Sequence, residues 1–287
     1  MSTLVIADCG STKSDWRIIR GSAENVSVSL PGINPALQDR DSVLERLSLL
    51  RGAVGADEDA HVYYYGAGTV SENAKASVKE CLGEIFPGAE CEIESDMTGA
   101  ARALFGDGEG IAAIIGTGAN SAFCRGGRPV LSVPSGGFIL GDEGSGAWIG
   151  RMLLSDYIKS LMPEDIREEF SSVCPLDYAG IVDAVYSSGA PNGFLASFAP
   201  FARKFKEHPY VDNLLKEGFE LFFTRNLMQY GCLRCFPVRM TGSVAYYFSD
   251  KIGEVAAAHG ATVDMVRISP MEGLVKYHSQ KYGIGNV

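Results

Sequence analysis

The chain alternates between short apolar runs and longer segments in which an apolar residue recurs every three or four positions. Short runs bounded by turn residues predict β-strands, and the longer spacing predicts amphipathic helices. The expected strands cover residues 3–9, 14–20, 25–30, 61–66, 90–94, 111–115, 236–241 and 262–268. The expected helices cover 39–52, 71–86, 96–104, the segment around Trp148, most of 160–235, the segment after Ser243 and the segment from Met271. This alternation predicts an α/β fold.

The stretch Gly106-Asp107-Gly108 is the best candidate for a domain boundary. We expect an N-terminal α/β domain over 1–107 and a C-terminal α/β domain over 108–287, with the terminal helix able to pack back on the first domain. Both halves open with a hairpin that carries a glycine turn. This similarity indicates a faint internal duplication.

The two glycine turns are the most informative local features. Asp8-Cys9-Gly10-Ser11-Thr12-Lys13-Ser14 joins the first two expected strands, and Gly116-Thr117-Gly118-Ala119-Asn120-Ser121 follows the strand at 111–115. Such a turn directs several backbone N–H groups and hydroxyls one way, which suits an anion. Two of them indicate a phosphate chain held from both sides. A plain β-hairpin turn without a ligand is the alternative for each.

Composition excludes several classes of protein. The formal net charge of −10 argues against a nucleic-acid partner, because polyanion binding needs clustered Lys and Arg. No apolar run approaches the roughly 20 residues of a membrane span, and Met1-Ser2-Thr3 lacks the basic start of a signal peptide. A cytoplasmic protein is therefore expected. The seven cysteines are scattered and indicate reduced thiols, and the CxxC pair Cys232 and Cys235 lacks a second metal-binding pair.

Three motifs together resemble one family. They are Asp8–Lys13, Gly116–Asn120 and Gly141-Asp142-Glu143-Gly144-Ser145-Gly146, and they are similar to those of the BadF/BadG/BcrA/BcrD-type ATPases, specifically the N-acetylglucosamine kinase-like branch. The resemblance runs from Asp8 to Gly273 and is weakest over 160–235. It implies the two-domain, ribonuclease H-like fold of actin, Hsp70 and hexokinase, with nucleotide in the interdomain cleft.

The implied activity is phosphorylation of N-acetylglucosamine or a close relative by ATP and Mg²⁺, with the 6-hydroxyl as the expected acceptor. In the first turn, Gly10, Ser11 and Thr12 offer donors to the phosphates, and Lys13 offers a point charge for the β- and γ-phosphates. Asp8 is expected to hold Mg²⁺ through water, because Mg²⁺ keeps several waters and takes few carboxylates.

In the second turn, Gly116, Thr117 and Gly118 let the backbone approach the phosphates closely. Neither turn is a P-loop, because no Gly-x-x-x-x-Gly-Lys-[Ser/Thr] occurs in the sequence, and neither opens a helix as a Rossmann fingerprint would.

Asp96 stands between a strand and a helix, where Ser or Asp usually caps the helix. The resemblance implies a second role, in which an Asp at this position accepts the proton of the sugar hydroxyl. The two roles are compatible, and Asp96 is our candidate for the catalytic base.

The resemblance also implies a sugar site. Asp142 is expected to bind sugar hydroxyls, Gly137 to bring its backbone to the sugar, and Asn34 and Asn120 to bind the substrate. Glycines and acids at a helix start, and an Asn in a turn, are the structural alternatives. Gly136 stands where the family usually has Trp. We expect this position to leave room beside the substrate, enough for the lactyl ether of N-acetylmuramic acid.

Gly242 and Ser243 match the adenosine-side turn of this superfamily, and Gly273 resembles the second half of that clasp. Helix starts with small residues are the alternative for all three.

Two other functions share this fold. An ATPase activator of a 2-hydroxyacyl-CoA dehydratase would carry a cysteine just before the second turn, where Ile114 and Ile115 stand. An actin- or Hsp70-like nucleotide switch would need a polymer contact or a peptide domain. The expected partner is a small amino sugar, with no nucleic acid and no membrane. A homodimer is compatible with the sequence, which does not fix the amino sugar, the hydroxyl or the oligomeric state.

Overall fold

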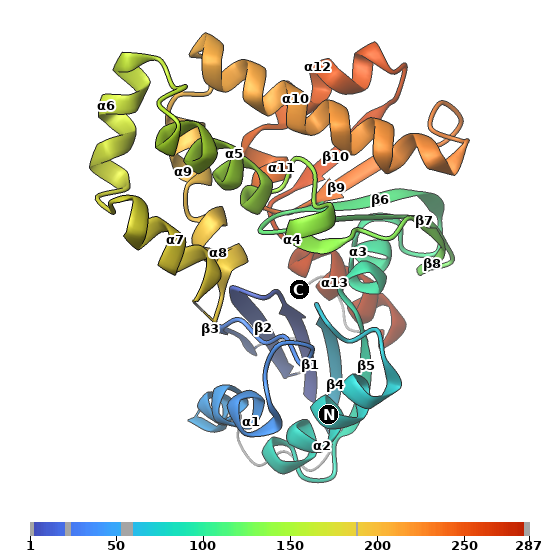
Figure 1. Cartoon of the computed structure of the whole chain (residues 1–287). Helices are drawn as coiled ribbons and strands as arrows, with labels where there is room; N and C mark the ends of the chain where they lie inside the picture. The colour runs from blue at the N-terminus through green and yellow to red at the C-terminus, as the bar shows by residue number, and fades with distance from the viewer. Residues whose placement is uncertain (1–2, 21–23, 53–59, 188, 284–287) are drawn as a thin grey trace. The chain divides into compact units, whose positions relative to one another are not determined.

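The computed structural model describes residues 3–20, 24–52, 60–187 and 189–283 (Figure 1). Met1 and Ser2, on which the absence of a signal peptide was partly argued, lie outside them. Contacts between Cα atoms divide the chain into two compact units. The first consists of Met1–Gly108, Arg125–Pro129 and Ser269–Val287, and the second of Glu109–Cys124 and Val130–Ile268.

The first unit is built on a five-stranded mixed sheet with the order β3-β2-β1-β4-β5 (Figure 1). Its strands are β1 (Thr3–Cys9), β2 (Lys13–Arg20), β3 (Glu24–Pro31), β4 (Ala60–Gly66) and β5 (Glu90–Ser95). The first three strands are antiparallel neighbours, whereas β4 runs parallel to both β1 and β5. Parallel strands are usually buried on both faces, and the central strands β1 and β4 are, whereas the edge strands β3 and β5 are partly exposed.

Helices cover both faces of this sheet. They are α1 (Arg40–Ser48) with a short 3₁₀ turn η1 (Leu49–Gly52), α2 (Glu72–Ile85), α3 (Asp96–Phe105) and α13 (Met271–Lys281). Successive residues of a strand point to opposite faces. Accordingly, Val5 and Ala7 of β1 join the core that includes α1 and α2, while Leu4 and Ile6 join the core that includes α13.

A buried polar chain fixes α13 to the first unit. The Arg102 guanidinium on α3 donates to the Tyr65 hydroxyl on β4 over 2.6 Å, and this hydroxyl lies 2.7 Å from Nε2 of His278 on α13. Burial, together with the charges of Arg102 and Lys281, lowers the pKa of His278 to about 3. The imidazole is therefore neutral, so Nε2 can accept a hydrogen bond from the Tyr65 hydroxyl. The end of the chain is thereby anchored beside α3.

The second unit is built on another five-stranded sheet, in the order β10-β9-β6-β7-β8. Its strands are β6 (Glu109–Ile115), β7 (Ala119–Arg125), β8 (Arg128–Ser132), β9 (Val238–Thr241) and β10 (Val263–Arg267). The strand β9 runs parallel to both β6 and β10. With two mixed sheets and surrounding helices, the α/β fold class expected from the sequence is confirmed.

The second unit holds the larger helical part. Its helices are α4 (Gly137–Leu140), α5 (Gly146–Ile158), α6 (Glu164–Val173), α7 (Tyr178–Tyr186), α8 (Pro191–Ala196), α9 (Ala199–Lys204), α10 (Pro209–Arg225), α11 (Ser243–Tyr247) and α12 (Ser249–Ala258), with a 3₁₀ turn η2 (Leu227–Tyr230). Trp148 of α5 and the aromatic face of α10 meet in one core. No helix within the described residues has the length and apolar composition needed to cross a membrane.

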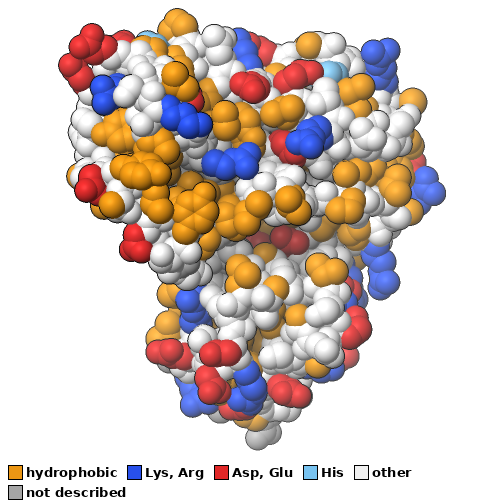
Figure 2. Space-filling model, in the orientation of Figure 1, with side chains coloured by type: hydrophobic (Ala, Val, Ile, Leu, Met, Phe, Trp, Pro, Cys, Tyr) orange, Lys and Arg blue, Asp and Glu red, His pale blue; other side chains and the backbone are white. Residues whose placement is uncertain are grey.

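Apolar side chains also gather on the outside of this helical part. Figure 2 shows them over the region of α6 to α9, with basic side chains among them. Leu161, Val173 and Leu176 are among the exposed apolar residues here. Next to them, Leu176, Phe194 and Pro200 line a small cavity. Pro200 also lines a second cavity, which belongs to the site described next.

Candidate active site

The first glycine turn is tied to the loop that follows β3. Gly10 N donates to the Lys13 carbonyl over 2.9 Å, which closes the turn between β1 and β2. Ile33 N then donates to the Gly10 carbonyl over 3.1 Å, and Asn34 Nδ2 donates to Ser11 Oγ over 2.9 Å. The structure therefore brings together two site residues, Ser11 and Asn34, that lie far apart in the sequence.

Asn34 also stabilises its own loop. Its Oδ1 accepts a hydrogen bond from Ala36 N over 3.0 Å, which is an Asx turn of the kind considered from the sequence. The side chain is almost fully buried. Both ends of this amide thus have protein partners, and the orientation of Ser11 depends on them.

Lys13 presents its charge at the surface of the first turn. Its Nζ lies 2.9 Å from Asp15 Oδ1, and 63% of its side chain is exposed. An exposed ion pair contributes little to stability, so the ammonium group can exchange Asp15 for a phosphate at small cost.

We expect Lys13→Ala to raise the KM for ATP about tenfold or more while changing the KM for the sugar little, because a charge-assisted hydrogen bond contributes roughly 1.5–3 kcal/mol. Steady-state kinetics with each substrate varied in turn measures this. Lys204→Ala is the matched control, since Lys204 also has a 2.9 Å ion pair and is 65% exposed. A change confined to the sugar KM would mean that the first turn does not bind the nucleotide.

Two carboxylates of the first unit influence one another. Asp8 lies near the end of β1, where its register partners are Asp15 on β2 and Tyr65 on β4. Burial, together with the charges of Asp96 and Asp15, raises the pKa of Asp8 to about 7, although the charge of Lys13 opposes this shift. Burial also raises the pKa of Asp96. The strand end and the start of α3 therefore hold a pair of acids whose charged forms are disfavoured without a cation.

The geometry at the start of α3 separates the two roles considered for Asp96. Ser95 is the N-cap, and its Oγ accepts from Thr98 N over 3.2 Å. Asp96 is the first helical residue, and its Oδ1 accepts from the adjacent Met97 N over 2.8 Å. Since Ser95 supplies the cap, the Asp96 carboxylate retains acceptor capacity for another partner.

The residues present fit a magnesium ion but not a structural metal site. Within the described residues, no group of three or more His, Cys, Asp or Glu side chains is arranged to hold a metal ion. The CxxC pair forms a simple turn, in which Cys235 N donates to the Cys232 carbonyl over 2.9 Å. Magnesium bound to a nucleotide needs only one or two carboxylates beside phosphate and water. Asp8, whose ionisation is disfavoured by its acidic neighbours, matches that requirement.

The second glycine turn is held by hydrogen bonds to the Gly141–Gly146 motif and the start of α5. Gly146 N and Ala147 N, at the start of α5, donate to the carbonyls of Gly116 and Thr117 over 2.8 and 3.0 Å. Asp142 Oδ1 accepts from Ala119 N over 3.1 Å. The Gly141–Gly146 motif therefore contacts the second turn directly, which spacing in the sequence did not reveal.

Asp142 occupies a strained position. Its φ is 53°, a left-handed conformation that few residues other than glycine adopt. Burial raises its pKa to about 6, while the Ala119 N–H lowers it and the charge of Glu143 raises it. A Cβ atom on Gly118 would lie 2.9 Å from Asp142 Oδ2, so Gly118 allows this carboxylate to lie against the turn. Such strain often occurs at functional sites.

Glu143 was not among the expected site residues, yet it is buried and fully engaged. Its Oε1 lies 2.7 Å from Arg225 Nη1, and its Oε2 accepts from Asn226 Nδ2 over 3.4 Å. These contacts attach the Gly141–Gly146 motif to the end of α10. The sequence signal for Glu143 was its place beside Asp142, but its partners are distant in the chain.

Gly136 has a backbone reason to be glycine. Its φ of 75° is left-handed, and an added Cβ would lie 3.2 Å from the Leu140 carbonyl carbon. A Trp introduced here would therefore strain the start of α4. Gly137 also has a positive φ, but no heavy atom lies within 4 Å of its Cβ position. Asn120 lies in β7, and its Oδ1 accepts from Ser121 N.

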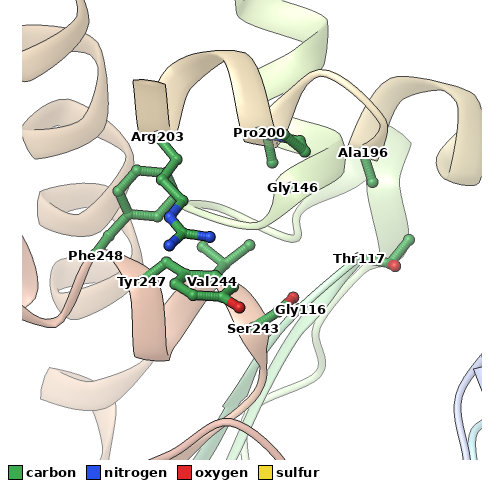
Figure 3. Close-up of a pocket in the computed structure, with 11 residues that line it drawn as sticks. Gly116, Thr117, Gly146, Ala196, Pro200, Arg203, Ser243, Val244, Tyr247 and Phe248 are labelled. Atoms are coloured by element: carbon green, nitrogen blue, oxygen red, sulfur yellow. The ribbon is translucent and has the colours of Figure 1, made fainter. Parts of the chain in front are cut away.

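A cavity of about 200 Å³ opens beside the second turn (Figure 3). Its wall includes Gly116 and Thr117 from the turn and Ser243 from the start of α11, three of the residues expected to bind nucleotide. Gly242 directly precedes Ser243, and its N–H donates to the Arg267 carbonyl over 3.0 Å. The cavity therefore joins the turn expected to bind phosphate with the segment expected to bind adenosine.

Sequence reasoning missed most of the cavity wall. The missed residues come from α8, α9 and α11 and the segments next to them: Ala196, Ala199, Pro200, Arg203, Val244, Tyr247 and Phe248. No local motif marks α8 and α9.

Gly273 lies in the first unit, where an added Cβ would be 2.3 Å from the Ala103 carbonyl oxygen. Close packing of α13 on α3 thus accounts for glycine at this position.

Known structures resemble this chain along almost its whole length. A candidate N-acetylglucosamine kinase from Porphyromonas gingivalis is 37% identical, with a TM-score of 0.87 over 97% of this chain and 99% of that one. A second candidate N-acetylglucosamine kinase, from Chromobacterium violaceum, is 16% identical, with a TM-score of 0.70 over 96% and 99%.

A ROK family glucokinase from Streptomyces griseus, in complex with glucose and AMPPNP, is 15% identical, with a TM-score of 0.57 over 97% of this chain and 99% of that one. At this identity the likeness concerns the fold alone. No model of a protein family matches the sequence, and no curated protein matches it.

Proposed function

This chain belongs to the N-acetylglucosamine kinase-like branch of the BadF/BadG/BcrA/BcrD-type ATPase family, and we propose that it transfers the γ-phosphoryl group of ATP to N-acetylglucosamine or a close relative. The acceptor is the 6-hydroxyl. The reaction class is that of a sugar kinase, a phosphotransferase with an alcohol acceptor. The observation that carries the proposal is the Asp96 carboxylate at the start of α3, beside Asp8 and not required as the helix cap.

Asp96 is the proposed catalytic base. Its carboxylate accepts a hydrogen bond from the sugar 6-hydroxyl and takes the proton as the hydroxyl oxygen bonds to the γ-phosphorus. The bond between this phosphorus and the bridging oxygen to the β-phosphate breaks, which leaves ADP. Phosphoryl transfer depends mainly on positioning and charge neutralisation. The raised pKa of Asp96 favours acceptance of that proton.

The phosphates are bound from both glycine turns. Gly10, Ser11, Thr12 and Lys13 belong to the first turn, and Gly116, Thr117 and Gly118 belong to the second. Support comes from the connection of each turn to its surroundings: Asn34 holds Ser11, and the start of α5 holds Gly116 and Thr117. Magnesium, with Asp8 as its protein carboxylate, would neutralise charge on the phosphates.

The sugar is bound by Asp142, Asn34 and Asn120, with the backbone of Gly137 beside it. A carboxylate such as that of Asp142 can accept two hydrogen bonds from vicinal hydroxyls, and Oδ1 already accepts one from Ala119 N. The absence of a large side chain at Gly136 leaves space for a 3-O-substituent. N-acetylmuramic acid is therefore proposed as a substrate comparable to N-acetylglucosamine.

A coupled assay of ADP release tests this function. Purified protein is incubated with MgATP and, separately, with N-acetylglucosamine, N-acetylmuramic acid, glucose and no sugar. We expect both amino sugars to stimulate ADP release, with kcat/KM values within about tenfold of each other, because a tolerant pocket keeps the difference in barrier near the lower end of the roughly 1–3 kcal/mol that a single added group changes it by. ATP hydrolysis that no sugar stimulates would contradict a sugar kinase. Rejection of N-acetylmuramic acid alone would remove only that substrate.

A further inference from the structure

The cavity beside the second turn has two chemically different ends. Gly116 and Thr117 lie at one end, and Arg203, Tyr247 and Phe248 lie at the other (Figure 3). All of these residues belong to the second unit. The first end presents a glycine turn suited to phosphate, whereas the second presents flat side chains. A ligand that fits both ends carries an anionic chain joined to a flat ring.

Arg203 covers one face of the Tyr247 ring. Its guanidinium carbon lies 3.6 Å from the ring centroid, which is stacking contact between two planar groups. No carboxylate of the described residues forms an ion pair with Arg203, whereas the adjacent Lys204 pairs with Glu169. The position of the guanidinium is thus set by an aromatic ring rather than by an acid, and its planar group remains available to a ligand.

We propose that Arg203, supported by Tyr247, forms the stacking surface for the purine base of the phosphoryl donor. This assignment rests on the proposed function. A guanidinium is planar and weakly hydrated, so it stacks on aromatic rings on either face. Base stacking on such a surface contributes roughly 1–3 kcal/mol per base. Arg203 therefore acts in nucleotide binding and specificity and takes no part in the chemical step.

The rest of the cavity wall favours recognition of the base by stacking rather than by hydrogen bonds to its edge. None of the residues lining the cavity carries a carboxylate or an amide side chain, and five of the eleven are Ala, Pro, Val or Phe. Stacking depends on ring area, and a purine offers more than a pyrimidine. Preference for ATP over CTP therefore comes largely from Arg203 and should shrink when the guanidinium is removed.

Isothermal titration with two magnesium-bound probes tests the assignment. AMPPNP carries base and phosphates, and tripolyphosphate carries phosphates alone. In Arg203→Ala we expect the Kd for AMPPNP to rise roughly 5- to 50-fold, in line with loss of a stacking contact, and the Kd for tripolyphosphate to stay within about twofold of wild type. Arg203→Lys should resemble Arg203→Ala, because an ammonium group keeps the charge but not the plane.

Arg167→Ala is the matched control, since Arg167 is exposed on α6 and does not line the cavity. Three results would each overturn the proposal: an unchanged Kd for AMPPNP in Arg203→Ala, equal weakening of both probes, or restoration by lysine. Equal weakening or restoration by lysine would make Arg203 a phosphate ligand. Sugar is absent from these titrations, so a failure of the sugar kinase proposal would show in the ADP-release assay and not here. Thermal unfolding curves confirm that each variant is folded.

Discussion

Asp96→Asn is expected to lower kcat by about 10²- to 10⁴-fold, the usual contribution of a general base, with little change in binding of ATP or sugar. An amide at this position still reaches the sugar hydroxyl but cannot accept its proton. The same change should leave the melting temperature equal to that of wild type or higher. Burial raises the pKa of Asp96 in the folded state, so the charged form of this carboxyl destabilises the fold relative to a neutral group.

The sign of this stability effect follows from proton linkage. With a pKa above its unfolded value, Asp96 contributes stability below the unfolded pKa, and this contribution is lost as the pH rises through the folded pKa. Asn does not titrate, so its contribution to stability does not change with pH in this way. The gain in melting temperature from Asp96→Asn should therefore grow as the pH rises above the unfolded pKa and vanish in acid, where the wild-type carboxyl is protonated.

Ser95→Ala is the matched control for Asp96→Asn, because Ser95 supplies the cap of α3. We expect it to cost about 1 kcal/mol of stability and to keep most of the activity. The two substitutions should thus have different effects. Asp96→Asn should lose activity, whereas Ser95→Ala should lose stability. If Asp96→Asn instead melts lower and turns over normally, Asp96 is a structural residue and not the base.

Gly242→Ala is expected to lower the melting temperature by roughly 4–8 °C, which corresponds to about 2 kcal/mol in a domain of this size, and to raise the Kd for AMPPNP by at least about tenfold. The backbone of Gly242 has φ 117° and ψ 155°, a region essentially restricted to glycine that costs other residues roughly 1–3 kcal/mol. An added Cβ would also lie 2.3 Å from the Ile115 carbonyl oxygen. Relief of this overlap displaces the strand end that carries the second turn.

Gly253→Ala is the matched control for Gly242→Ala. Gly253 lies in α12, and apart from the adjacent residues and the backbone of the helix itself, no heavy atom lies within 4 Å of its Cβ position. Alanine is favoured over glycine in a helix by roughly 0.5–1 kcal/mol, so this variant should melt slightly higher and bind AMPPNP normally. Thermal unfolding and isothermal titration measure both variants. Tight AMPPNP binding by Gly242→Ala would show that the turn at Gly242 does not shape the nucleotide cavity.

The fold followed from local patterns because both sheets are built from short buried runs. Residues 3–9 were expected as a strand and form β1, with side chains buried on both faces. The strand expected over 236–241 begins only at Val238, since Phe236 N donates to the Cys232 carbonyl and Phe236 therefore belongs to the preceding turn. The helix expected over 39–52 ends as α1 at Ser48 and continues as a 3₁₀ turn. Periodicity identifies elements better than it identifies their ends.

The site was predictable where a short motif carried it and hidden where distant segments met. Ser11, Thr117 and Ser243 belong to recognisable turns. Arg203 and Tyr247 come from helices with no motif, and only folding brings the guanidinium over the ring. From the sequence, the cap of α3 was considered as a role of Asp96, because Ser and Asp both favour that position. The hydrogen bond from Thr98 N to Ser95 Oγ assigns the cap to Ser95 instead.

The measurement that tests the central claim most directly is the stoichiometry and identity of the product. Wild type and Asp96→Asn are incubated with MgATP and N-acetylglucosamine, and ADP and sugar phosphate are quantified in the same sample by ³¹P NMR. The account predicts equal amounts of ADP and a phosphate monoester at the sugar 6-position for wild type, and almost none of either for Asp96→Asn. ADP formed without sugar phosphate, or sugar phosphate formed equally by both proteins, would contradict it.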